Sequence, residues 1–309
     1  MAFGRTLTAS RSRSSCPPDH RIHSPAIRKS LMQLSCLPVS FFEEIIQGRM
    51  SVADWAKLGK RLGLDAIDIS ILFIPERTLE QARRIRKDVE QAGMSITMMT
   101  SYPDFTHPQA QQREIELQAA IHSVQLAAEV GARFLRVTAG QAHPETPLEE
   151  GCRWAIEGLN ALVTETAHLG VQLVYENHAK PGVWQYTDFS QPPQIFLQIL
   201  DQLDRRIQVN FDTGNATAFS PQPLALLETV LPRLGSIHAS DTARIGALEH
   251  VLIGTGKVDY PAIFRCLQNA HWDGWICIEE ASYQGEAGIR QAIQFIRSTW
   301  QQILLEKQS

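Results

Sequence analysis

The 309-residue sequence is poor in cysteine, in net charge and in long apolar runs. Its five cysteines are odd in number, widely spaced and without a CxxC pair, which argues against a disulfide framework and a structural zinc site. We therefore expect a reduced, cytoplasmic setting. No apolar run approaches the roughly 18 to 20 residues of a membrane-spanning helix, so we expect no membrane partner. A net charge of −4 gives no reason to expect nucleic acid as a partner.

The first 29 residues differ in composition from the rest of the chain. They are rich in Arg, Ser and Pro, and Asp19 is their only acidic residue. They lack the apolar segment of a secretory signal, although their composition resembles a transit peptide. We expect residues 1–29 to form a disordered tail, or to reflect a misassigned start with Met32 nearer the true one. Residues 30–309 are expected to form a single domain.

From Leu31 onward, short apolar runs alternate with amphipathic segments eight times, at intervals of about 30 to 40 residues. The strand-like runs are 31–37, 65–73, 94–100, 132–140, 171–178, 206–215, 235–241 and 272–280. The helix-like segments are 51–63, 77–93, 109–130, 148–169, 191–203, 223–231, 259–270 and 288–305. Ser51 is a suitable N-cap, and Gly63 and Gly131 are suitable helix stops.

Repeated strand–helix units predict a parallel sheet, and eight of them favour closure into a barrel. The alternative is an open, doubly wound sheet. Such a sheet usually carries a GxGxxG turn after its first strand, and this sequence has none there. We therefore predict an α/β fold, a (β/α)8 TIM barrel.

Four successive runs in the second half end in a side chain suited to binding a metal. These ends are Glu176, Asp212, His238 and Glu279. The carboxyl ends of neighbouring barrel strands meet at the rim where such barrels place their chemistry. Singly, each residue has an ordinary alternative, such as a strand-end salt bridge, a helix N-cap or a core histidine. Their recurrence favours one divalent cation, such as Mn²⁺, Mg²⁺, Co²⁺ or Zn²⁺, which would also relieve the repulsion among three carboxylates.

The segments LVYENH, VNFDTGNA, SIHASD, IGTGKVDY and GWICIEE together resemble the xylose isomerase-like TIM-barrel superfamily. The nearest resemblance is to its sugar phosphate isomerase/epimerase group, which includes ketohexose 3-epimerases, hydroxypyruvate isomerases and inosose dehydratases. The resemblance implies that Glu176, Asp212, His238 and Glu279 hold one divalent metal. It also implies that Glu176 and Glu279 act as acid and base on opposite faces of a small sugar or sugar phosphate. Dimers and tetramers are common in the group, so a homo-oligomer is expected by analogy.

This chemistry follows from the weak acidity of a proton α to a carbonyl, which a carboxylate cannot remove unaided. A metal bound to the carbonyl oxygen stabilises the developing enediolate. One glutamate removes the proton and the other returns it from the opposite face. We therefore expect a metal-dependent sugar isomerase or epimerase.

Four further residues are candidates for binding substrate. Arg244 stands where epimerases of the group carry an arginine that grips the substrate near its carbonyl, and an exposed loop arginine is the alternative. His250 matches a histidine common in the group. His178, like Lys180, follows the first metal-binding strand end, where a polar loop is the alternative. Asn215 is a departure, because several sugar epimerases carry histidine at this position.

Glu280 lies beside Glu279, and side-chain alternation along a strand lets only one of the two point inward. We expect the inward one to be Glu279, because it directly ends the apolar run WICI.

Three alternative functions stand beside the isomerase. The first is an endonuclease of the apurinic-site type. Such enzymes share this barrel and its Glu, Asp and His strand ends, but they use three zinc ions and additional histidines. This sequence has Leu248 where those endonucleases carry an aspartate ligand. His107 and His143 lie well out in loops, so the early strands end without a clear histidine ligand. An inosose dehydratase-type lyase would use the same centre. A non-catalytic metabolite-binding barrel would keep buried carboxylates without a metal, which is costly.

Overall fold

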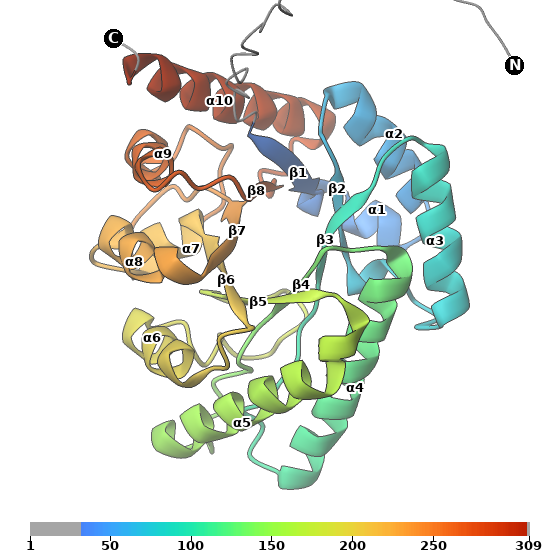
Figure 1. The fold of residues 1–309 in the computed structure, drawn as a ribbon, viewed down its shortest axis with the longest axis vertical. Coiled ribbons are helices and arrows are strands. Elements are labelled where there is room, and N and C mark those ends of the chain that lie inside the picture. The colour runs from blue at the N-terminus through green and yellow to red at the C-terminus, as the bar shows by residue number, and fades with distance from the viewer. Residues whose placement is uncertain (1–31, 308–309) are drawn as a thin grey trace, which may run out of the picture. The chain divides into compact units, whose positions relative to one another are not determined.

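The computed structural model describes residues 32–307, which form an eight-stranded parallel barrel surrounded by helices (Figure 1). The strands are β1 (Gln33–Leu37), β2 (Ile67–Ser70), β3 (Ile96–Thr100), β4 (Phe134–Val137), β5 (Gln172–Glu176), β6 (Gln208–Asp212), β7 (Leu234–Ala239) and β8 (Trp275–Glu279). The helices are α1 (Phe42–Ile46), α2 (Val52–Leu62), α3 (Leu79–Gln91), α4 (Ala110–Val130), α5 (Leu148–Thr166), α6 (Pro193–Gln202), α7 (Thr213–Phe219), α8 (Pro223–Val230), α9 (Tyr260–Asn269) and α10 (Gly285–Glu306).

The predicted TIM barrel is confirmed, and each of the eight strands coincides with one of the predicted runs. The tail expected at residues 1–29 lies outside the described residues, and its separation from the barrel domain stays a prediction.

Helix α2 shows how local sequence sets the bounds of an element. The Ser51 hydroxyl accepts a hydrogen bond from the Asp54 N–H at 3.1 Å, and the Asp54 carboxylate accepts one from the Ser51 N–H at 3.3 Å. This capping box begins the helix. Gly63 ends it with a φ of 84°, and Gly131 ends α4 in the same way with a φ of 77°. The predicted cap and the two predicted stops are thereby confirmed.

Two short helices, α1 and α7, were not expected from the sequence. Helix α7 begins directly after β6, because the Asp212 side chain accepts a hydrogen bond from the Asn215 N–H at 2.6 Å and caps the first turn. The glycine at position 214 disfavours a helix on propensity, so the DTGN segment looks like a loop in the sequence. Helix α10 also begins earlier than expected, at Gly285.

Side-chain alternation along the strands separates two apolar layers. Outward-facing side chains pack against the helices and form the main core. Inside the barrel, Met98, Phe134, Val174 and Cys277 form a second cluster, against which Trp275 packs. The inward positions beyond this cluster, at the carboxyl ends of the strands, are polar. The barrel is therefore filled at its middle and chemically distinct at one rim.

Strands β1 and β2 close the barrel without a shared backbone ladder in the part of the chain that the structure describes. The Asp65 N–H donates a single hydrogen bond to the Leu34 carbonyl at 2.9 Å. Beside it, the buried Asp68 carboxylate accepts from the Ser35 hydroxyl at 2.7 Å and from the Met98 N–H at 3.0 Å. Burial raises the pKa of Asp68 to about 6, although these hydrogen bonds favour its charged form.

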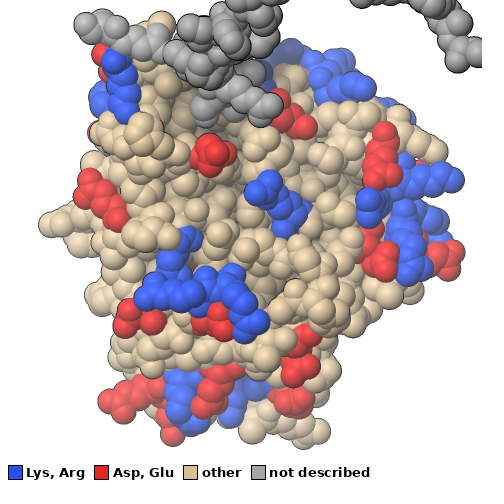
Figure 2. All heavy atoms as spheres, viewed as in Figure 1, with Lys and Arg blue, Asp and Glu red and all other residues tan. Residues whose placement is uncertain are grey.

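Three observations bear on the surroundings of the protein. None of the helices between residues 32 and 307 is long and apolar enough to cross a membrane. Four of the five cysteines lie in the described region, and all four are free thiols. Acidic and basic side chains are interspersed on the face shown in Figure 2. The cytoplasmic location and the lack of a nucleic-acid partner stay predictions.

We expect the pH dependence of stability to report on Asp68. Its folded-state pKa of about 6 lies above its ordinary value of 3.8, so the protonated form stabilises the fold at low pH. This contribution is complete below about pH 4 and is lost as the pH rises through about 6. Between about pH 4.5 and 7.5, the free energy of unfolding of the wild type should fall by roughly 2 to 3 kcal/mol relative to Asp68→Asn. Urea unfolding measures the difference, and an equal difference at both pH values would contradict the prediction.

Candidate metal centre

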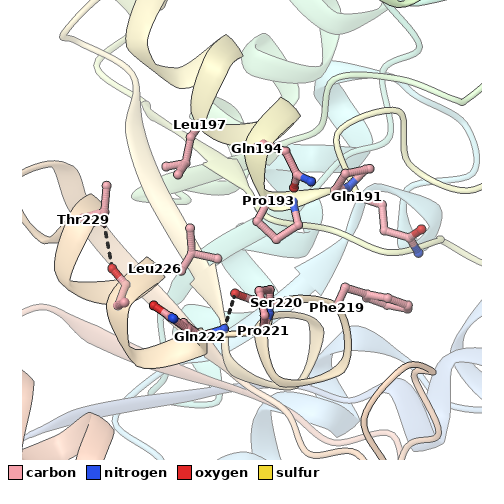
Figure 3. Close-up of a pocket in the computed structure, with 12 residues that line it drawn as sticks. Gln191, Pro193, Gln194, Leu197, Phe219, Ser220, Pro221, Gln222, Leu226 and Thr229 are labelled. Atoms are coloured by element: carbon pink, nitrogen blue, oxygen red, sulfur yellow. Dashed lines mark hydrogen bonds between the residues drawn. The ribbon is translucent and has the colours of Figure 1, made fainter.

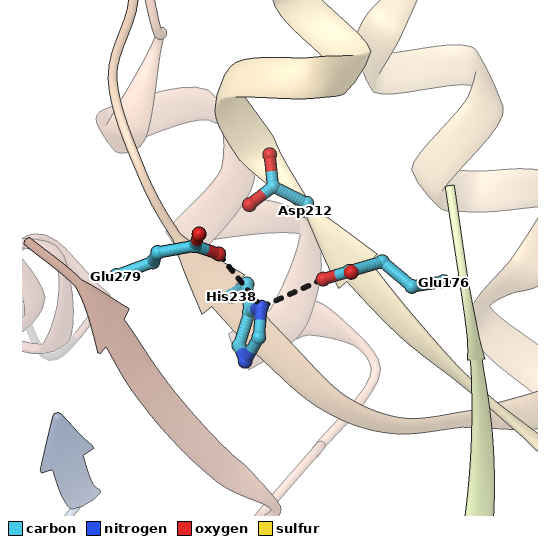
Figure 4. A group of neighbouring side chains, drawn as sticks. All are labelled: Glu176, Asp212, His238 and Glu279. Atoms are coloured by element: carbon cyan, nitrogen blue, oxygen red, sulfur yellow. Dashed lines mark ion pairs between the residues drawn. The ribbon is translucent and has the colours of Figure 1, made fainter. Parts of the chain in front are cut away.

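Four side chains from β5 to β8 converge at the carboxyl rim of the barrel (Figure 4). They are Glu176, Asp212, His238 and Glu279, the four residues predicted from the sequence to be metal ligands. One ligand atom from each lies within 4.8 Å of the others. Asp212 and His238 are direct partners across β6 and β7, and alternation turns all four side chains inward. This is the one group of its kind found in the described chain.

His238 lies between the two glutamates. Its Nδ1 is 2.6 Å from Glu176 Oε1 and 3.0 Å from Glu279 Oε2, and Figure 4 shows the two carboxylates approaching from opposite sides. Among the described residues, no partner of Nδ1 meets the geometry of a hydrogen bond. The other ring nitrogen, Nε2, lies 3.2 Å from Met98 Sδ. Nδ1 is therefore the nitrogen that faces the carboxylates, as a metal ligand would.

The charges of the centre suit a divalent cation. Glu176, Asp212 and Glu279 bring three negative charges, and the buried Arg136 guanidinium, 3.1 Å from Glu176 Oε2, brings one positive charge. With His238 neutral, a net charge of −2 is left in a buried place, which one divalent cation balances. Three carboxylates and an imidazole are ligands that Mn²⁺, Mg²⁺, Co²⁺ and Zn²⁺ accept.

Two of the four side chains, His238 and Asp212, bind protons strongly. Burial lowers the pKa of His238, but the Glu176 and Glu279 carboxylates outweigh it and raise this pKa well above its ordinary value. Burial, and then the charges of Glu279 and Glu176, raise the pKa of Asp212 well above its ordinary value. Burial would also raise the pKa of Glu279, but the His238 imidazolium brings it down to about 2. A cation must therefore displace protons from His238 and Asp212 to bind here.

Arg136 and Asn210 support Glu176, and neither was predicted from the sequence. Arg136 Nη1 donates to the Ser101 carbonyl at 3.1 Å, and its guanidinium lies 4.8 Å from the centre of the Tyr102 ring. Asn210 donates to Glu176 Oε1 at 2.6 Å. The sequence signal for Arg136 is a charged residue at an inward position of the apolar strand FLRV.

Asp212 is held by its side chain and by its backbone. The Ser240 hydroxyl lies 2.9 and 3.0 Å from the two carboxylate oxygens, and the Asn215 N–H donates to one of them at 2.6 Å. The Asn177 side chain accepts from the Asp212 N–H at 2.8 Å and donates to the Asp212 carbonyl at 2.9 Å. Asn177 is a further residue that was not predicted from the sequence. The carboxylate is fixed before any ligand binds.

A cavity of about 1010 Å³ opens onto the centre, with Asp212, Glu279 and Arg136 among its lining residues. Of the residues expected to bind or face substrate, four also line it: His178, Lys180, Asn215 and His250. The structure does not bring Arg244 to the cavity. Its side chain is 64% exposed and lies 3.1 Å from Glu249, which holds it on the outside of its loop.

Glu280 and His143 have partners away from the centre. The Glu280 carboxylate accepts hydrogen bonds from the hydroxyls of Ser40 and Ser282, so Glu279 is the one of the adjacent pair that faces the other ligands. His143 Nε2 lies 2.7 Å from Asp104 Oδ2.

A second cavity of about 550 Å³ lies between α6 and the α7–α8 segment (Figure 3). Gln, Pro, Leu, Phe, Ser, Ala and Thr side chains line it. As far as the structure describes this lining, it holds no acid, base or thiol. It offers no group for metal binding or acid–base chemistry.

Comparison with known proteins gives consistent results. The family model described as xylose isomerase-like TIM barrel matches residues 56–299. An inosose dehydratase of Clostridium beijerinckii is 25% identical over an alignment of 189 residues, and the match covers 49% of this chain and 58% of that enzyme. The chain thus spans a little over half the length of this relative.

Solved structures share the fold. The apo 3-keto-D-glucoside 4-epimerase of E. coli has a TM-score of 0.70 and 16% identity, over 87% of this chain and 100% of that one. A D-psicose 3-epimerase of Clostridium cellulolyticum H10 with D-tagatose has a TM-score of 0.68 and 12% identity, over 80% and 93%.

We expect metal uptake to release protons and to weaken as the pH falls. His238 and Asp212 hold protons that a cation must displace, so affinity should fall roughly tenfold per pH unit for each displaced proton. Calorimetric titration of the full chain with Mn²⁺, in two buffers of different ionisation enthalpy, measures the proton count. Glu280→Gln is the matched control and should keep the wild-type behaviour. Uptake without proton release would contradict this description of the centre.

Proposed function

The chain belongs to the xylose isomerase-like TIM-barrel family, and we propose that it is a divalent-metal-dependent isomerase or epimerase of a small sugar or sugar derivative. One observation carries the proposal. The carboxylates of Glu176 and Glu279 lie on opposite sides of His238 Nδ1 (Figure 4). A substrate carbon bound near that atom meets a carboxylate on each face, which supports removal of a proton from one face and its return to the other.

Glu176, Asp212, His238 and Glu279 are the residues that would hold the cation. A bound cation supplies positive charge that polarises the substrate carbonyl and stabilises the negative charge that develops beside it.

The two glutamates differ in access to substrate. The Glu279 side chain is 19% exposed and lines the cavity, whereas the Glu176 side chain is fully buried. The pKa of Glu279 is held at about 2, and burial is outweighed for Glu176 by Arg136 and His238, which lower its pKa. Both are thus ionised at neutral pH in the protein without a cation, and a bound cation would keep them ionised by its own positive charge. We assign first contact with the substrate proton to Glu279, and the return from the opposite face to Glu176.

A dehydratase-type lyase is the second candidate, and His178 favours it. The imidazole is buried and lines the cavity, with Nε2 3.9 Å from Glu176 Oε2. Burial and then the Arg136 charge lower the pKa of His178 to about 4, although Glu176 opposes them. The ring is therefore neutral at pH 7 and carries one N–H. In an elimination, a carboxylate takes the α-proton and passes it to the β-hydroxyl, which leaves as water, while the His178 N–H donates a hydrogen bond to that departing oxygen.

An endonuclease and a non-catalytic barrel receive less support. An endonuclease of the three-zinc type needs further ligands beside the four-residue centre. His143 lies against Asp104 instead, and the described residues hold one group with metal-binding spacing. A non-catalytic barrel would keep Glu176 and its partners buried without a reaction to use them. Of the candidate functions, an enzyme acting on a small sugar thus has the most support. We also propose a cytoplasmic location.

We expect Glu279→Gln to abolish exchange of the substrate α-proton with solvent. The amide keeps the shape of the side chain but cannot accept the proton, so the exchange rate should fall by at least roughly 10²-fold. Proton NMR in D₂O, with ketohexoses and inososes as substrates, measures the rate. Metal content and circular dichroism check that the centre and the fold survive. Glu280→Gln is the matched control, because its carboxylate faces Ser40 and Ser282. Unchanged exchange in Glu279→Gln would assign the proton to another residue.

The product distinguishes the two candidate reactions. An isomerase or epimerase keeps the mass of its substrate, whereas a dehydratase loses one water, which mass spectrometry detects. If the His178 N–H binds the leaving hydroxyl of an elimination, His178→Leu, which has no donor, should lower the rate of water loss by roughly 10²-fold while α-proton exchange continues. Equal loss of both activities would indicate that His178 serves the first proton transfer or substrate binding.

A further inference from the structure

The cavity above the metal centre is larger than a free sugar needs. Its volume of about 1010 Å³ lies at the upper end of the range for sites that hold drug-sized ligands, whereas a hexose has only about twelve non-hydrogen atoms. The residues that carry chemistry, among them Asp212, Glu279 and Arg136, occupy the floor. The segment between β1 and α2, which includes α1, supplies more of the remaining lining than any other segment.

The outer part of this cavity presents apolar side chains from three segments beside polar ones. Phe42 and Ile46 come from α1, Leu248 from the segment after β7, and Tyr283 from the segment after β8. Ile46 and Tyr283 are 49% and 75% exposed, although side chains of this kind are usually covered. Exposed apolar side chains beside a ligand cavity mark a surface that a bound molecule covers. A free sugar on the floor would leave them in water.

The charges of the outer part disfavour an anionic ligand. Glu43 and Glu44 line it on α1, and Lys180 lines it as a single cation. On the floor, Arg136 is already engaged by Glu176 at 3.1 Å. A phosphate group reaching this part of the cavity would meet two carboxylates, of which Glu43 lies 3.8 Å from Arg49, and one ammonium group. A neutral group meets no such repulsion.

Resting on the proposed function, we infer that the substrate is a sugar that carries a neutral, largely apolar substituent, such as an aryl or alkyl ether or glycoside. The polar ring lies over the floor, where the ligands and the two glutamates are. The substituent lies along α1, against Ile46 and Tyr283. The preferred substrate is then neither a free sugar nor a sugar phosphate.

Three matched compounds test the inference on the full chain loaded with Mg²⁺. They are a ketohexose, its phosphate ester at the terminal hydroxyl, and its benzyl ether at the same hydroxyl, so all three keep the carbonyl. Calorimetry gives the dissociation constants, and NMR in D₂O gives α-proton exchange. Burial of the benzyl ring should make the ether bind about tenfold more tightly than the ketohexose, and the phosphate should bind no more tightly than the ketohexose.

The two readouts separate the inference from the proposed function. Tighter binding of the ether without exchange in any compound would support the apolar subsite and contradict the isomerase. Exchange with equal binding of ether and ketohexose would overturn the inference alone. Tightest binding by the phosphate, or no binding by any of the three, would also overturn it.

Variants of the outer wall give a second test. Ile46→Ser and Tyr283→Ser remove apolar surface from α1 and from the segment after β8, so the preference for the ether over the ketohexose should fall toward one. Ile115→Ser is the matched control: this isoleucine is 51% exposed on α4 and does not line the cavity. It should keep the wild-type preference. A preference that survives in both wall variants would overturn the assignment.

Discussion

Repulsion among three carboxylates in one buried place is the constraint on which the rest of the centre depends. Glu176, Asp212 and Glu279 give up hydration, and their charges oppose one another. A buried guanidinium, an imidazole between two of the acids, and hydroxyl and amide donors offset this repulsion. These partners come from several neighbouring strands: Arg136 from β4, Asn210 from β6, and His238 and Ser240 from β7 and its end. Parallel strands in a closed barrel bring such residues together because their carboxyl ends all meet at one rim.

The middle and the carboxyl end of each strand serve different purposes, because every second side chain of a strand points into the barrel. Val174 and Cys277 point inward two positions before Glu176 and Glu279. The first pair belongs to the apolar cluster that fills the barrel, and the second pair belongs to the centre. The centre therefore lies on a packed layer in which these apolar side chains stand beside the buried Ser35, Asp68 and Ser236, and this layer keeps water on one side of the centre. A low dielectric beneath the centre strengthens the charge interactions at its rim.

Much of this could be predicted from the sequence, because the signals are local. A buried parallel strand is a short apolar run, and Glu176 ends one directly, so its strand end could be identified without knowing its neighbours. Arg136 and Asn210 could not be found this way. Each lies inside a strand, and their roles depend on which side chain of the next strand lies opposite. Arg244 shows the converse limit: its place in the sequence suggested a position near the substrate, whereas in the structure it lies beside Glu249, a nearby acid on the same loop, and does not line the cavity.

The Asn177 side chain has a further consequence for the ENH segment. Its amide pairs with both backbone groups of Asp212, as another residue of β5 would. The pairing between β5 and β6 is thus extended by one residue, while the main chain after β5 turns away from β6. Three consecutive residues supply an acid of the four-residue centre, a side chain that pairs with the backbone of β6, and an imidazole that lines the cavity. Inserting or deleting one residue here would displace all three at once, so this tripeptide can change by substitution but not in length.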